Sequence, residues 1–109
     1  MTSDKYQWQL TEIAENDIDE ATAYIAQELQ NPDAASHLLD EIENALDRLS
    51  RAPFTGRIVN NNYIKRNDVR RILVMNYIVY YLVDDSSNNI IVLRFAYNRR
   101  NQSDILETI

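Results

Sequence analysis

The stretch VRRILVMNYIVYYLVDDSSNNIIVLRFAYNRR, residues Val69–Arg100, holds three runs of β-branched, aliphatic and aromatic residues. Asn76 divides the first run from the second, and the polar segment 84–89 divides the second from the third. Such runs with short polar breaks favour strands joined by hairpins, so we predict strands over 69–75, 77–83 and 90–97. Strands joined by hairpins run antiparallel, and the stretch therefore predicts a three-stranded meander.

Two helical patterns precede the meander. Apolar side chains recur every three or four positions from residue 12 to 29, and a second such stripe runs to about residue 50. Thr11 is a suitable N-cap for the first helix, because its hydroxyl can accept a hydrogen bond from a free backbone N–H. Asn31 as N-cap and Pro32 at the first helical position begin the second helix. The short link predicts an antiparallel helical hairpin.

Smaller elements are expected outside these segments. Tyr6, Trp8 and Leu10 alternate with glutamines, which predicts a short N-terminal strand. We expect the dipeptide 63–64, Tyr63-Ile64, to pair briefly with the sheet. Ser103 is expected to cap a short C-terminal helix.

Together these elements predict the α+β class, with the order β-α-α-β-β-β followed by the short helix. The hairpin is expected to pack on one face of a mainly antiparallel sheet, leaving the other face open or partly covered by the chain ends. The length of 109 residues predicts one domain over residues 1–109.

Charge is divided unevenly along the chain, whose net charge is −6. Residues 1–50 hold 12 acidic and two basic side chains, a balance of −10, whereas residues 51–109 hold five and nine, a balance of +4. The two halves therefore suggest one acidic and one basic side. A basic side could face phosphate or an acidic protein, or the halves could simply neutralise each other across the fold.

Composition excludes several classes of site. With no cysteine and a single histidine, the chain has neither a thiolate nor a histidine-cluster metal site, and one glycine excludes a glycine-rich phosphate loop. We therefore predict no metal and no cofactor. No apolar run is long enough to span a bilayer and the first residues lack a secretory pattern, so we expect a cytoplasmic protein without membrane contact.

Arginines are concentrated in and after the meander. A period of two places Arg71 on one face of the first strand and Arg70 on the other. In the last strand it places Arg94 with Val92 and Ala96, opposite Leu93, Phe95 and Tyr97. One arginine from each outer strand, with tyrosines between them, could line the open face, where guanidinium groups would bind phosphate and aromatic rings would stack on bases. The alternative for each arginine is an ion pair with a nearby acid.

The order and spacing of the motifs over nearly the whole chain resemble the RelE/ParE superfamily of toxins from bacterial type II toxin–antitoxin systems. The motifs are Leu10-Thr11, Asn31-Pro32, Pro53, Gly56, Arg71-Ile72, Asn76-Tyr77, Tyr80-Tyr81 and Tyr97-Asn98-Arg99-Arg100-Asn101. The resemblance implies a growth-inhibiting toxin of a plasmid-stabilisation module, with a cognate antitoxin as partner and operator DNA contacted only through that antitoxin.

Three activities are consistent with the resemblance. RelE-like members are metal-independent endoribonucleases that cut mRNA on the ribosome, ParE-like members inhibit DNA gyrase, and a degenerate toxin would act only as an antitoxin-binding co-repressor. In the nuclease the 2′-hydroxyl attacks the adjacent phosphate and arginines stabilise the developing charge, so no cofactor is required.

The resemblance also implies functional residues. For the nuclease, Arg71 and Arg99 match basic catalytic positions, and Tyr97 is the candidate for proton transfer. The expected contacts to RNA or another target are Arg70, Arg94, Arg100, Tyr80 and Lys65. The chain departs from the pattern at Ile78, where the middle strand usually carries an arginine, and at Ile105, which replaces a C-terminal tyrosine. These departures move the sequence toward the gyrase alternative, but the convergence of five arginines makes the ribosome-dependent nuclease the first prediction.

Overall fold

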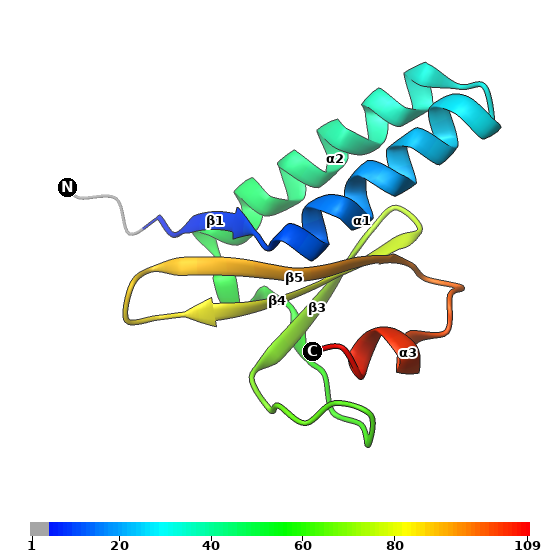
Figure 1. The fold of residues 1–109 in the computed structure, drawn as a ribbon. Coiled ribbons are helices and arrows are strands. Elements are labelled where there is room, and N and C mark those ends of the chain that lie inside the picture. Colours follow the sequence, from blue (N-terminus) through cyan, green and yellow to red (C-terminus); the bar gives the residue numbers. More distant parts are fainter. Residues whose placement is uncertain (1–4) are drawn as a thin grey trace.

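The computed structural model describes residues 5–109 and confirms the α+β class (Figure 1). The helical elements are α1 (Glu12–Ala23), the π-helical turn η1 (Tyr24–Glu28), α2 (Pro32–Arg51), the 3-10 turn η2 (Pro53–Thr55) and α3 (Gln102–Leu106). The strands are β1 (Gln7–Leu10), β2 (Arg57–Ile58), β3 (Val69–Val74), β4 (Tyr77–Asp84) and β5 (Asn89–Tyr97). They form a sheet in the order β1-β5-β4-β3-β2, in which β1 runs parallel to β5 and the other neighbours are antiparallel.

Side-chain caps begin both long helices as predicted. The Thr11 hydroxyl and the Asn31 side-chain oxygen each accept a hydrogen bond of 3.1 Å from the backbone N–H three residues ahead. The first helix, however, is regular only to Ala23, whereas the prediction extended it to residue 29. Its last turn widens so that Leu29 N donates to Tyr24 O, five residues back, at 3.2 Å. Gln30 then adopts a left-handed φ of 50°, which ends the helix.

The main core lies between the helical hairpin and the inner face of the sheet (Figure 1). The buried hydroxyl of Tyr81 forms hydrogen bonds with the segment that follows α2. Tyr81 OH donates to Pro53 O and accepts from Gly56 N, both at 2.9 Å. A Cβ atom at residue 56 would lie 2.5 Å from that hydroxyl and 2.8 Å from Arg71 O, so only glycine fits there. This junction directs the chain from η2 into β2.

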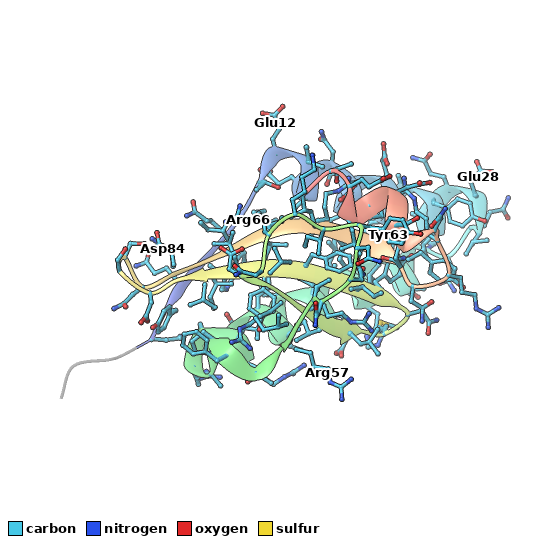
Figure 2. The ribbon with its side chains drawn as sticks, turned by 90° about the horizontal axis from the view of Figure 1, so that it is seen from below. Glu12, Glu28, Arg57, Tyr63, Arg66 and Asp84 are labelled. Atoms are coloured by element: carbon cyan, nitrogen blue, oxygen red, sulfur yellow. The ribbon has the colours of Figure 1, made fainter. Side chains whose placement is uncertain are left out.

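The outer face of the sheet is partly covered. A second buried cluster contains Val59 and Ile64 from the loop after β2, and Ile105 and Leu106 from α3. Figure 1 shows α3 on the side of the sheet opposite the helical hairpin, and Figure 2 shows the loop with Tyr63 and Arg66 crossing the sheet. The expected cover by a chain end is therefore confirmed for the C-terminus.

Three predicted details are wrong. Arg57–Ile58 forms the extra edge strand, whereas residues 63–64 lie in the loop because Ile64 is buried in the outer cluster. Asn101, not Ser103, caps α3, since its side chain accepts from Ser103 N. Ladder partners shift from Tyr80↔Arg94 to Tyr81↔Val92, which leaves Leu93 as an extra residue.

The β-bulge at Leu93 reverses the expected alternation in β5. Val92 and Phe95 pack in the inner core, whereas Leu93 and Ala96 pack in the outer cluster. Arg94 therefore shares a face with Ala96, as predicted, but not with Val92. Within residues 5–109, no helix has the length and apolar content needed to cross a membrane.

Candidate functional site

A groove of about 820 Å³ opens between the end of the helical hairpin and the β3–β4 turn. Its walls carry four large apolar or aromatic side chains that are 43–56% exposed: Tyr24, Leu29, Met75 and Tyr97. Tyr77, which also lines the groove, stacks on Phe95 with ring centroids 4.7 Å apart and meets the Tyr97 ring edge-on at 5.6 Å. Exposed apolar grooves of this kind are typical of protein-interaction sites.

The turn at the mouth of the groove is strained. Met75 has a left-handed φ of 56°, a conformation that disfavours any residue with a bulky side chain. The turn is held in part by Asn98 N, which donates to Asn76 O at 2.8 Å. Two-residue hairpin turns commonly require a positive φ at their first central residue, and here the turn presents a half-exposed methionine to the groove.

Arg94 is bound to side chains of two other segments, α1 and the residues after α3. Its Nε and one terminal nitrogen donate to the Asp17 carboxylate at 2.8 and 3.0 Å, and the other terminal nitrogen donates to Thr108 Oγ1 at 2.8 Å. Asp17 also accepts from Phe95 N at 3.0 Å. The two side chains are 12% and 8% exposed, and the hydrogen bond to Asp17 raises the pKa of Arg94. Arg94 thus fastens α1 to β5 and to the C-terminal segment.

Arg70 lies on the inner face, where it supports the junction before β2. One of its terminal nitrogens donates to Gly56 O at 2.7 Å and to Phe54 O at 3.2 Å. The guanidinium also lies 5.1 Å from the centre of the Phe54 ring. These contacts stabilise the entry into β2.

Arg71 lies on the outer face in a row that crosses the sheet. Strand register places it opposite Arg57 of β2 on one side and Tyr80 of β4 on the other, and Tyr80 is opposite Arg94. Tyr80 OH donates to Gln102 Oε1 at 2.7 Å. Burial raises the pKa of Tyr80, and the positive charge of Arg71 opposes that rise. Arg71 and Arg57 are exposed, and in Figure 2 Arg57 projects from the sheet edge.

The structure divides the other predicted site residues between surfaces. Tyr97 lies at the groove, on the face opposite Arg71. Arg99 and Arg100 are exposed after β5, and Arg100 lines the groove. Lys65 is exposed in the loop that crosses the outer face. The outer row thus combines Arg71, Tyr80 and Arg94 as expected, but Arg70 and Tyr97 lie elsewhere.

Sequence reasoning missed Arg57 and the groove residues at the end of the first helix, Tyr24 and Leu29. Arg57 belongs to a two-residue strand, which is too short for any period to be recognised. Tyr24 and Leu29 continued the predicted helical stripe, so the pattern gave no sign that they are 55% and 56% exposed. In residues 5–109 no group of three or more acidic or histidine side chains is placed to hold a metal ion.

Comparisons with known proteins agree with this architecture. Residues 9–102 match the family model described as the ParE toxin of the type II toxin–antitoxin system parDE. The chain therefore belongs to the ParE toxin family of type II toxin–antitoxin systems. A search of curated proteins gives no match.

Solved structures share the fold at low identity. A chain of the chromosomal ParDE system from P. aeruginosa has a TM-score of 0.66 and 18% identity, over 87% of this chain and 98% of that one. A chain of the RelBE2 complex from Mycobacterium tuberculosis has a TM-score of 0.62 and 19% identity, over 85% and 98%. The archaeal RelE–RelB complex from Pyrococcus horikoshii gives 0.51 and 14%, over 89% and 99%.

Proposed function

We propose that this toxin acts in the bacterial cytoplasm by binding a protein target, DNA gyrase, without cleaving RNA. The observation that carries the proposal is that several of the arginine and tyrosine side chains expected to act on RNA form hydrogen bonds within the protein instead. Arg94 is bound to Asp17 and Thr108, Arg70 to two carbonyls, and Tyr80 to Gln102.

The separation of the expected catalytic side chains also supports binding rather than cleavage. Arg71 is on the outer face of the sheet, and Tyr97 is at the groove on the inner face. An arginine that stabilises a phosphorane and a group that moves the proton must both reach one phosphate, so opposite faces of a sheet are unsuitable positions. The match to the ParE toxin family also supports the proposal of binding without RNA cleavage.

We further propose that the cognate antitoxin neutralises the toxin by placing an apolar segment in the groove. Toxins of the same fold were solved in complexes with antitoxins. In this chain the exposed side chains of Tyr24, Leu29, Met75 and Tyr97 provide the apolar contact surface. Burial of several such side chains would supply the anchors that dominate interface energies.

The test is a supercoiling assay with purified gyrase and purified toxin, paired with growth curves after induction in a bacterial host. We expect growth arrest and loss of supercoiling, both reversed by the cognate antitoxin. Mapping of mRNA 5′ ends in the same culture should show no new cleavage sites. Growth arrest with intact supercoiling would refute the gyrase proposal.

Ribosome-dependent RNA cleavage is the second candidate, because Arg57 and Arg71 are exposed on adjacent strands beside Tyr80. This pair could neutralise a phosphate. The nuclease predicts new mRNA ends at codons in the A site and their loss in the variant Arg71→Ala. Unchanged ends in that variant would exclude a catalytic role for Arg71.

A further inference from the structure

A second hollow, separate from the groove, lies between β1 and the middle of α2. It measures about 230 Å³, and its apolar walls come from Trp8, Leu10, Ile18, Leu39, Ile42 and Leu46. None of its lining residues belongs to the groove. Leu39 is 47% exposed at its rim. In Figure 1, β1 lies beside the end of α2 that leads to residue 51. The hollow has room for one or two apolar side chains of a partner.

The strand that borders the hollow is an open edge of the sheet. Gln7 N donates to Asn88 O and Thr11 N donates to Val92 O, both at 3.0 Å. Alternate residues of a parallel strand bond to the same neighbour, so the backbone groups of Trp8 and Leu10 point away from β5. The sequence of β1 holds no proline or charged residue of the kind that protects natural edges. An added strand could therefore pair here.

Two acidic side chains of α2 line the hollow. Asp40 and Glu43 line it, and Asp47 lies one helical turn beyond Glu43, so three carboxylates follow one another along α2. Asp47 accepts from Trp8 Nε1 at 3.2 Å. Asp40 and Glu43 are exposed and belong to neither of the ion pairs found in residues 5–109. Like charges at this spacing repel, and a cationic partner would relieve that repulsion.

We infer that β1 and this hollow form a docking site for an extended cationic segment of another protein. The segment pairs with the backbone of Trp8 and Leu10, inserts an apolar side chain beside Leu39, and places lysine or arginine near Asp40 and Glu43. Because alternate side chains of a strand point to opposite faces, the apolar and basic residues that face α2 stand two positions apart in the segment. The inference is independent of the toxin's target.

Trp8 is the sole tryptophan of the chain and lines the hollow, so its fluorescence reports occupancy directly. The probe is a capped heptapeptide, Val-Thr-Lys-Thr-Val-Thr-Lys, in which the valines and lysines share one face of the strand, titrated to about 1 mM because so small a surface binds weakly. We expect a saturable change in Trp8 emission. The same peptide with glutamate in place of lysine, or with N-methylated backbone amides, should give no saturable change.

Variants locate the charge contacts. Glu43→Lys should weaken the probe roughly three- to tenfold, and Glu43→Gln by less, as expected for exposed ion pairs. Glu107→Lys, which makes the same charge change at an exposed residue after α3, should bind as the parent does. Circular dichroism of each variant checks that the fold is retained.

Four outcomes would overturn the inference. They are the absence of a saturable emission change, equal binding of the glutamate peptide, equal binding of the N-methylated peptide, and equal affinities of the Glu43→Lys and Glu107→Lys variants. Equal binding of the N-methylated peptide would exclude strand pairing.

Discussion

The substitution Asp17→Asn would leave the positive charge of Arg94 without its carboxylate partner inside the fold. Asparagine has nearly the same shape and can still accept from Phe95 N, so the main change is the loss of the carboxylate charge. The Arg94 side chain is only 12% exposed and would keep its charge without the two hydrogen bonds of 2.8 and 3.0 Å to a carboxylate. Breaking one side of a buried pair typically costs about 3–5 kcal/mol.

We expect the variant to lose about 3 kcal/mol of unfolding free energy, since Thr108 Oγ1 still accepts from Arg94. A typical domain has a total stability of about 5–15 kcal/mol, so this is a large fraction. For a chain of 109 residues it corresponds to a fall in melting temperature of about 12 °C. Urea unfolding followed by circular dichroism measures the loss.

The exposed pair Arg66–Asp68 is the matched control. Its side chains are 43% and 50% exposed, so Asp68→Asn should cost less than about 1 kcal/mol. Adding Arg94→Met to Asp17→Asn should recover part of the loss, because the unpaired charge is removed. A loss in Asp17→Asn no greater than in Asp68→Asn would show that the buried pair does not hold α1 on β5.

Three further predictions concern the sheet and the groove. Gly56→Ala should cost about 1–3 kcal/mol in urea unfolding, because the added Cβ would lie 2.5 Å from Tyr81 OH; loss of less than about 0.5 kcal/mol would contradict that packing. Burial raises the pKa of Tyr77, Tyr80 and Tyr81 above 10.0. The neutral side chains therefore contribute fully to the unfolding free energy below the pKa of the unfolded chain, and this contribution is lost as pH rises through the folded pKa values. Phenolate absorbance should rise later with pH in the native protein than in urea, and coincident curves would refute this. Met75→Gly should change stability by less than about 1 kcal/mol, because relief of the left-handed strain is offset by glycine's freedom in the unfolded chain. It should weaken antitoxin binding about tenfold in calorimetry, and unchanged affinity would remove Met75 from the interface.

The distribution of charge along the sequence predicted an acidic and a basic side of the molecule, but not which charged residues contact each other. The first half of the chain is acidic and the second is basic, as the sequence shows directly. The structure joins the halves at Asp17 and Arg94, which are 77 residues apart, and leaves Arg57 and Arg71 exposed. Cross-fold neutralisation therefore accounts for one predicted arginine but not for the whole basic group.

Local sequence determined the helices, their caps at Thr11 and Asn31, and the three long strands, because residue period and capping chemistry act over a few neighbouring residues. Tertiary structure alone decided the bulge at Leu93, the parallel pairing of β1 with β5, and the cover that the loop after β2 adds to the outer face. These features depend on contacts between distant segments, and an extra residue in one strand reverses which face every later side chain occupies.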